Sequence, residues 1–387
     1  MLCCKSTFSG QCPEAVVPQE PVVALTDTTI CRYFTHGSWT CLWFIQLLIL
    51  RLQKWHVPFR TFFSDHMSLI RETALMVKHQ SPHAHRTHAQ ESPWSYIAKS
   101  LVLLTCALTV AGGSWYVAVD LTTASDLTAI YNCNAFFAYA FSVPLLGERL
   151  RWDKVTAVAI AVVGVFVVAY GDSFSSESST SSSDTDTSSE LPSSHPDSAP
   201  SRGLGNLIIG VGSILYGLYE VLYKRLGCPP SGTSPGRSMI FANFIGTCIG
   251  LFTLTFLWIP IPLLNYTGLE VWELPRGEAL HLLLISVFAN AVFSGCFLVL
   301  MSLTSPVLAS VAALLTIFIV AIIDEVMPPP LHNDLSTAAL FGGTVIIVAF
   351  LMLSWATYRE MDEERREKAQ RDELEDSEEE DEEGHEV

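Results

Sequence analysis

The chain has 387 residues, of which 50% are apolar and 16% are charged. Its apolar residues are gathered in blocks long enough to cross a hydrocarbon layer of ~30 Å, which excludes an ordinary soluble domain. The formal net charge of −17 arises mostly in residues 359–387, which hold 16 acidic and 5 basic residues. No basic stripe lies elsewhere, so a nucleic-acid partner is excluded as well.

The N-terminal part of the chain contains a segment without a continuous apolar stretch, followed by one weak candidate for a membrane-spanning helix. Residues 1–29 have no continuous apolar core, so no cleavable signal peptide is expected. The block at 30–50 is weak because Arg32 and His36 lie in its first turns. Eight stronger blocks follow, at 97–119, 125–146, 155–171, 204–223, 238–258, 279–300, 303–323 and 338–356. The sequence therefore predicts an all-α polytopic membrane protein with about nine transmembrane helices.

The distribution of lysine and arginine predicts the orientation of the spans. Eighteen of these residues fall on the side of the loop 51–96 and the C-terminal tail, whereas four fall on the opposite side. Because cytosolic loops are enriched in Lys and Arg, that loop and the tail are expected in the cytosol. The N-terminus is then non-cytosolic if 30–50 spans the membrane, and cytosolic if 30–50 only lies on its surface.

A polar linker divides the chain into two similar halves. Residues 172–203 are rich in Ser, Asp and Pro, so a disordered linker is expected between a first repeat at 30–171 and a second at 204–356. Each half has a span that ends in an acidic residue, Glu148 or Glu325, and the following loops lie on opposite sides. Inverted repeats of this kind are typical of secondary transporters. Four spans precede the linker and five follow it, which indicates either a nine-span variant lacking a first helix or a sequence that starts late.

Polar residues form a stripe along the span at 125–146. Its members fall within about 60° of one another on a helical wheel: Ser125, Thr128, Asn132 and Tyr139. Such groups would be unsatisfied in lipid, so the stripe must face other helices or a wet cavity. Interhelical hydrogen bonding and a solute pathway both fit this pattern. Asp126 lies near the start of the span and is expected to reach the membrane interface.

A second polar face lies on the span at 204–223. Its members follow at steps of three or four residues: Asn206, Gly210, Ser213, Gly217, Glu220 and Lys224. The glycines allow close packing, and Glu220 and Lys224 have the spacing of an ion pair. Two interpretations remain for Glu220: it lines a solute pathway, or it reaches the cytosolic end of the helix, ~6 Å away.

Other chemistry-bearing groups are sparse. Asn290 and Ser294 form a polar i, i+4 pair. Four histidines lie in the cytosolic loop without an acidic or cysteine partner in view, so a solvated loop is expected there instead of a metal site: His79, His83, His85 and His88. No CxxC pair, HExxH motif, P-loop or nucleophile–base set occurs, so neither a cofactor nor an enzyme is expected.

Residues 357–387 are expected to form an acidic cytosolic tail. Its first turns have the i, i+4 pairs Arg359/Glu363 and Glu364/Lys368 that favour a helix. The remainder is too acidic to pack. Truncation after Tyr358 is therefore expected to leave transport within about twofold of the full chain.

Several motifs together resemble one known family. The sequence G-E-R-L at 147–150, closing a span that opens with T-x-S-D, resembles the EamA-type drug/metabolite transporter superfamily. The stretches at 216–226, 250–275 and 302–325 resemble a branch close to subfamily F of solute carrier family 35 and to fungal vacuolar-membrane and thiamine-linked transporters. The resemblance covers about residues 97–356, with a tryptophan-proline element, T-G-x-E and L-T-S-P in order.

The resemblance implies ten helices in two inverted five-helix bundles, with a central site and alternating access. It implies one wall made by Tyr216, Tyr219, Glu220 and Lys224, and an opposing wall made by Asp126, Asn132 and Ser294. Gly295 stands at a position that is commonly acidic in the family.

The expected function is secondary transport of a small polar solute or metabolite, and the alternative is a non-transporting scaffold or receptor with the same fold. The expected partners are the solute, the lipid bilayer and a second copy of the chain in a homodimer. The expected location is the endomembrane system, vacuolar or alternatively Golgi. The expected substrate-binding residues are Asn206, Ser213, Tyr216, Tyr219, Glu220, Lys224, Asp126, Thr128, Asn132, Asn290 and Ser294.

Overall fold

The protein is helical throughout the part described by its computed structural model. The described residues are 33–34, 36–119, 121–180, 199–259, 262, 266, 277–326 and 337–385. Every element in these ranges is a helix, which confirms the predicted all-α class. The chain separates into two compact units: residues 1–148 with 184–309, and residues 149–183 with 310–387.

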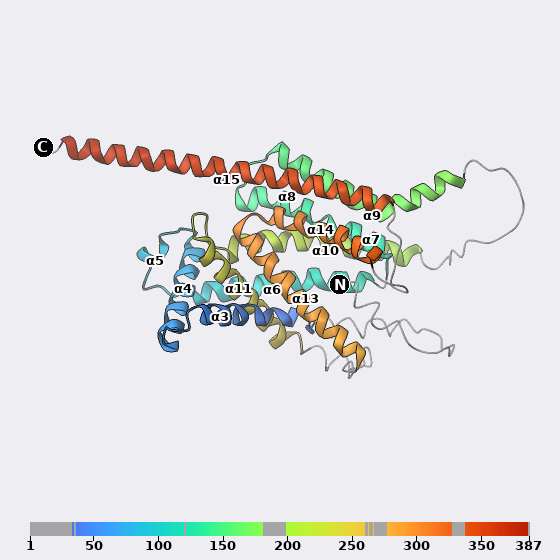
Figure 1. Ribbon diagram of the computed structural model, residues 1–387, viewed down its shortest axis with the longest axis horizontal. Helices are drawn as coiled ribbons and strands as arrows, with labels where there is room; N and C mark the ends of the chain where they lie inside the picture. Colours follow the sequence, from blue (N-terminus) through green and yellow to red (C-terminus); the bar gives the residue numbers. More distant parts are fainter. Residues whose placement is uncertain are drawn as a thin grey trace, which may run out of the picture. The chain divides into compact units, whose positions relative to one another are not determined.

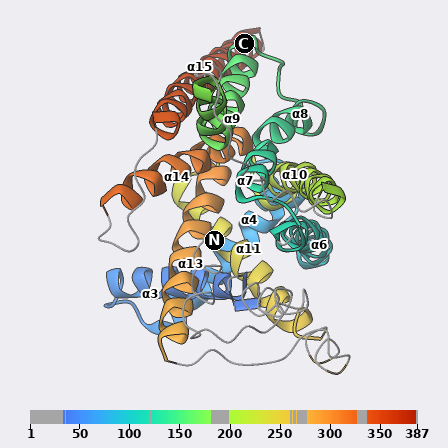
Figure 2. The same cartoon turned by 90° about the vertical axis from the view of Figure 1, so that its right-hand side faces the viewer.

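In the first unit, α10 (Ala199–Gly227) packs against α6 (Trp94–Val119) and α8 (Asn134–Leu146). Figure 1 and Figure 2 both show these helices side by side. Ala118, Leu127 and Ile209 form a buried cluster between α6, α7 (Ala124–Asn132) and α10. α10 therefore lies at the centre of the helices that carry most of the predicted site residues.

Another part of the first unit is built on α11 (Pro235–Phe256). This helix packs against α13 (Glu278–Leu303), α3 (Cys41–Gln53) and the short 3-10 helix η1 (Ser38–Thr40). The backbone N–H of Trp43 on α3 donates to Thr247 Oγ1 at 2.9 Å. The weak block predicted at 30–50 is thus represented, among described residues, by a short helix fixed to α11.

The predicted span at 125–146 is broken near its middle. α7 ends at Asn132 and α8 begins at Asn134, with Cys133 between them. Asn132 Nδ2 donates to the carbonyl of Thr128 in its own helix, at 2.8 Å. α8 ends at Leu146 and is capped by Gly147. The φ of Gly147 is 73°, the left-handed conformation that glycine adopts without strain, which explains the glycine of the G-E-R-L motif.

The segment 51–96, which the sequence predicted as a loop, is mostly helical. It contains α4 (Phe59–His79) and the single turn α5 (Ala84–Thr87). One face of α4 is buried, through Phe62, Ile70 and Val77 among others. The apolar stripe was missed because polar residues separate its members, so no continuous apolar block marks the helix.

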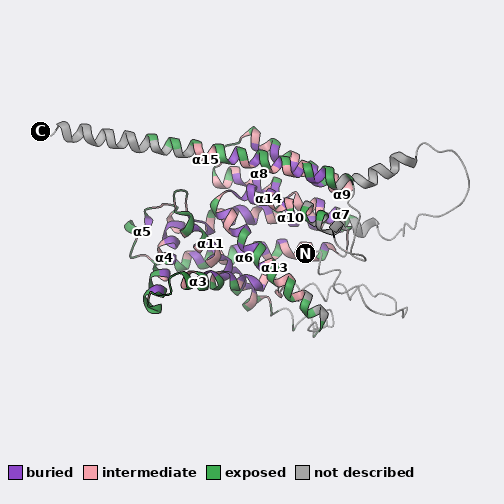
Figure 3. Cartoon of the chain, viewed as in Figure 1, coloured by how far each residue is buried: buried purple, intermediate pink, exposed green. Residues whose placement is uncertain are grey.

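The second unit pairs α9 (Trp152–Thr180) with α15 (Thr337–His385), which run side by side in Figure 1. The buried positions of α15, among them Ile346, Ala349 and Leu353, lie in the part beside α9 (Figure 3). α14 (Pro306–Val326) begins in the first unit and continues into the second.

Two helical regions extend past the segment boundaries that the sequence predicts. α9 continues to Thr180 and α10 starts at Ala199, so both ends of the linker predicted at 172–203 are helical; residues 181–198 lie outside the described residues. α15 continues to His385 and includes most of the predicted tail. Extending an existing helix fixes one residue for each new hydrogen bond, and glutamate is a good helix former, so neither polar stretch stops its helix at once.

Six helical stretches among the described residues are long and apolar enough to cross a membrane: Trp94–Val119, Asp126–Leu146, Gly203–Gly227, Pro235–Phe256, Leu283–Leu303 and Leu340–Glu363. They match six of the predicted blocks. The total of nine spans stays a prediction.

Candidate functional site

Among the predicted site residues, Glu220 has the most deeply buried charged side chain. It lies on α10 and is fully buried, with an exposed fraction of 0%. A side chain that reached the end of its helix would be partly exposed, so the geometry favours an inward position over that alternative. Ionisable residues inside a membrane are costly and usually mark a functional pathway.

Three tyrosines of α7 and α10 interact with this carboxylate. Tyr131 on α7 and Tyr216 and Tyr219 on α10 all interact electrostatically with Glu220. The ring centroids of Tyr131 and Tyr216 are 5.3 Å apart, and those of Tyr216 and Tyr219 are 5.7 Å apart. The Tyr219 hydroxyl is buried and has no hydrogen-bond partner among the described residues. The cluster thus combines aromatic faces with polar tips around one carboxylate.

Sequence reasoning missed Tyr131. Its ring also packs against Trp115 of α6, with centroids 4.7 Å apart and planes at 73°. Tyr131 lies three residues after Thr128, beside the predicted stripe instead of on it. The sequence signal was the step of three and four residues between Tyr216, Tyr219 and Tyr223, which predicts an aromatic face on α10 that needs an aromatic neighbour.

A second polar cluster joins the start of α7 to α10. Asn206 Nδ2 donates to Asp126 Oδ2 at 3.2 Å, and Thr122 Oγ1 hydrogen-bonds to both residues. The backbone N–H of Asp126 donates to Thr123 Oγ1, which caps α7. Asp126 is 2% exposed. Asp126 is thus held between the helices by the amide of Asn206 and by the start of α7, while its depth in the membrane stays a prediction.

Small residues of α10 set the distance between helices. A Cβ on Gly217 would lie 2.8 Å from the backbone nitrogen of Ala138 on α8, closer than real Cβ contacts allow. Ser213 is fully buried and donates from Oγ to the carbonyl of Tyr131 at 3.0 Å. This part of the predicted face therefore packs against α7 and α8, and the close approach at Gly217 is made by a partner helix.

Lys224 has a structural role that its sequence position did not reveal. Its Nζ donates to the carbonyls of Met301, Ser302 and Thr304, at 3.1, 2.8 and 2.8 Å. These contacts can engage all three N–H donors of an ammonium group. They satisfy carbonyls at the C-terminal end of α13, where a positive charge also interacts well with the helix dipole.

The remaining predicted residues are spread over two helices. Thr128 and Asn132 lie on α7, where Asn132 is bound to its own helix. Ser294 on α13 is buried, and Asn290 is half-buried one turn earlier. A Cβ on Gly295 would lie 2.9 Å from Leu42 Cδ2, so α3 occupies the space beside this position.

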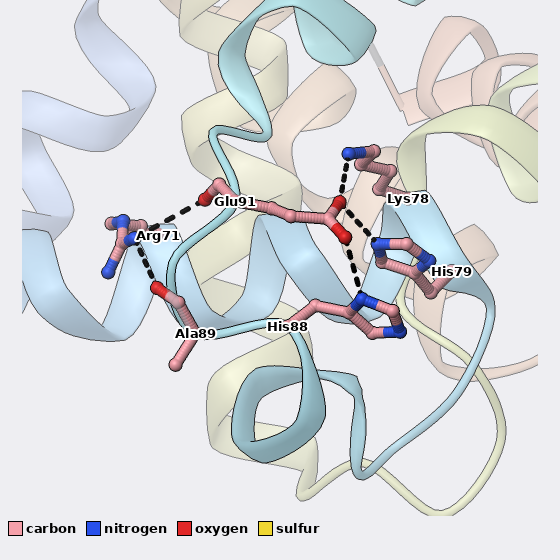
Figure 4. A network of polar contacts seen from close by, with 6 residues as sticks. All are labelled: Arg71, Lys78, His79, His88, Ala89 and Glu91. Atoms are coloured by element: carbon pink, nitrogen blue, oxygen red, sulfur yellow. Dashed lines mark hydrogen bonds and ion pairs between the residues drawn. The ribbon is translucent and has the colours of Figure 1, made fainter.

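The segment 51–96 holds a compact ionic cluster that the sequence did not predict. Glu91 accepts from Lys78 Nζ at 2.5 Å, and its two oxygens lie 3.1 Å from His79 Nε2 and 2.7 Å from His88 Nδ1 (Figure 4). These partners, Lys78 and then His88 above all, lower the pKa of Glu91 to about 2. The interpretation of these histidines as lacking an acidic partner was wrong, because the turn after α5 returns Glu91 to the end of α4.

Known proteins resemble this chain in sequence. Residues 60–170 match the EamA-like transporter family. An uncharacterized vacuolar membrane protein of Saccharomyces cerevisiae is 27% identical over 255 residues, which cover 64% of this chain and 60% of that protein. An uncharacterized transporter of Schizosaccharomyces pombe is 24% identical over 239 residues, covering 61% and 62%. Human solute carrier family 35 member F3 is 23% identical over 241 residues, covering 61% and 48%. The matched part of the chain thus spans about half to three fifths of the length of these relatives.

Proposed function

We propose, from the premise that this chain is related to the EamA-type drug/metabolite transporters, that it moves a small polar solute across an endomembrane by alternating access. The vacuolar membrane is the first choice of organelle, since one relative is named as a vacuolar membrane protein, and the Golgi is the second. The observation that carries the proposal is the fully buried Glu220 among Tyr131, Tyr216 and Tyr219.

The chemistry of this cluster suits a small polar or cationic ligand. A carboxylate attracts a proton or a cation, and aromatic faces bind cations and flat rings. The unsatisfied Tyr219 hydroxyl adds a group that can donate to or accept from a solute. We assign Glu220 to binding a proton or the cationic part of the solute, and Tyr131, Tyr216 and Tyr219 to contacting its body.

The polar residues farther along α7, α10 and α13 extend the proposed pathway. Asp126 and Asn206 form its non-cytosolic end, and Asn290 and Ser294 contribute from α13. Ser213 and Asn132 donate to backbone carbonyls in this conformation, and Thr128 lies on the same helix face as Asn132. The side chains of these three residues become available to the solute when the helices move. Lys224 is left out of the solute-binding set because its ammonium satisfies the end of α13.

Cysteine accessibility tests alternating access without knowledge of the solute. Single cysteines at Ser213 and Asn206, in a chain whose native cysteines are replaced, are labelled from each side of sealed vesicles with a membrane-impermeant thiol reagent. Transport predicts that both positions react from both sides, at rates that change with the solute pool. Leu207, 65% exposed on the outer face of α10, is the matched control and should stay unreactive in lipid. Permanent inaccessibility of Ser213 and Asn206 would support the scaffold alternative.

A further inference from the structure

The cluster around Glu91 lies between the end of α4 and the start of α6, in the segment 51–96 that is expected in the cytosol. His79 is the last residue of α4, His88 follows the single turn α5, and Glu91 precedes the start of α6 by three residues. Arg71 Nη2 donates to the carbonyls of Ala89 and Glu91, at 2.6 and 3.3 Å, which fixes the turn against α4 (Figure 4). Arg71 thus holds the turn that carries Glu91 against α4.

Three potential metal ligands converge there. The nearest ligand atoms of His79, His88 and Glu91 all lie within 4.8 Å of one another. The two imidazole rings are stacked, with centroids 3.9 Å apart and planes at 8°, so both present a nitrogen to the same carboxylate. The side chains are 25%, 38% and 40% exposed, so an ion can enter from solvent.

The donor set and the spacing fit a small divalent cation. Two histidine nitrogens and one carboxylate are a common zinc ligand set, with a fourth position open for water. In a tetrahedral site with bonds of about 2.0–2.1 Å, ligand atoms lie about 3.3 Å apart. The observed separations of 2.7 and 3.1 Å from Glu91 differ from this by less than an ångström. Each nitrogen lone pair lies in the plane of its ring, so binding of one ion requires one imidazole to rotate out of the stack.

We propose that His79, His88 and Glu91 form a binding site for a divalent transition-metal cation of the Zn²⁺ type on the cytosolic segment. The ion joins the C-terminal end of α4 to the segment that leads into α6, and it takes the place of the hydrogen bonds between the carboxylate and the imidazoles. Lys78 competes for the same Oε2 of Glu91, so the metal affinity is lower than the three ligands alone would give.

The test is a Co²⁺ titration of the purified full chain without a polyhistidine tag, read by visible absorption and followed by competition with Zn²⁺. The expected result is one Co²⁺ per chain, displaced by Zn²⁺. His79→Ala, His88→Ala and Glu91→Gln should each weaken binding by at least about tenfold. His83→Ala is the matched control, since His83 lies on the same segment outside the cluster, and should bind as the wild type does.

A second variant separates a metal site from an ordinary ion pair. Lys78→Met removes the competing ammonium, so Co²⁺ affinity should rise. Helicity by circular dichroism confirms that each variant is folded, and Glu91→Gln keeps the shape if an alanine variant does not fold. Absence of saturable Co²⁺ binding up to about millimolar, binding that survives His79→Ala with His88→Ala, or an unchanged affinity in Lys78→Met would each overturn the proposal.

Discussion

Gly164 and Gly342 lie against each other's backbone where α9 meets α15. A Cβ on Gly164 would come within 3.0 Å of the carbonyl oxygen of Gly342, and a Cβ on Gly342 within 2.8 Å of that of Gly164. These helices are the last of the two halves that the sequence predicts as repeats. One glycine from each helix thus lets the two backbones approach closely.

Alanine at either glycine should separate the two helices. Gly164→Ala and Gly342→Ala are expected to lower the thermal unfolding midpoint of the detergent-solubilised protein, although Gly→Ala in a helix ordinarily stabilises by roughly 0.5–1 kcal/mol. Gly236→Ala is the control, because nothing lies within 4 Å of a Cβ there. Equal midpoints for all three variants would show that the close contact is not maintained.

A buried histidine should make the packing of α3 on α4 sensitive to pH. Trp43 Nε1 donates to His66 Nε2 at 2.8 Å, which requires a neutral ring. Burial, and then the nearby Lys54, lower the pKa of His66 below its usual 6.5. Folding thus favours the neutral form, so the stabilisation is full above pH 6.5 and is lost as the pH falls toward the lowered pKa.

The measurement for His66 is the unfolding midpoint between about pH 7.5 and 5.5. His66→Gln keeps an acceptor for Trp43 but cannot be protonated in this range. The wild type should lose more stability on acidification than the variant does. Parallel curves would contradict a role for His66 protonation.

The contact between Lys224 and α13 should contribute to stability. Lys224→Met keeps the length of the side chain but removes its donors from three carbonyls. The unfolding midpoint should fall, since unsatisfied buried acceptors cost about 1–3 kcal/mol each. Lys99→Met is the control on an exposed position of α6 and should have little effect. An unchanged unfolding midpoint for Lys224→Met would argue that these hydrogen bonds do not form in the membrane.

The first residues of the acidic tail should be needed for stable folding, whereas its last residues should not. Lys154 is 1% exposed and is paired with Glu360, and Arg151 Nη1 lies 2.8 Å from Glu363. Truncation after Tyr358 removes both carboxylates, so the amount of folded protein should fall more than the sequence alone predicts. Truncation after Gln370 keeps them and should be tolerated.

Lys154→Met tests the reason for that difference. It replaces the buried ammonium with an apolar side chain, so it should restore the yield of the shorter truncation. Fluorescence-detected size-exclusion chromatography measures the folded yield of each form. Full tolerance of the truncation after Tyr358 would mean that these ion pairs contribute little.

Much of the helical framework could be predicted from the sequence, because apolar blocks have a length set by the membrane. The candidate site could not be predicted in the same way, because it depends on contacts between residues that are far apart in the sequence. Lys224 and the carbonyl of Thr304 are 80 positions apart, as are Asn206 and Asp126, and nothing local in the chain indicates either bond. Glu91 is close to His79 in sequence, but only the turn after α5 brings the two side chains together.

Replacement of Glu220 by glutamine is the most direct test of the transport assignment, because it keeps the shape of the buried side chain and removes its charge. Untargeted metabolite profiles of vacuoles and Golgi vesicles from cells with and without the chain identify the solute, and its uptake is then measured in vesicles. Glu220→Gln should reduce uptake at least about tenfold, equivalent to 1.4 kcal/mol, with protein level and location unchanged. Glu148→Gln, the same change just after the C-terminal end of α8, should transport normally. Wild-type uptake by Glu220→Gln would contradict the assignment of this carboxylate to the solute pathway.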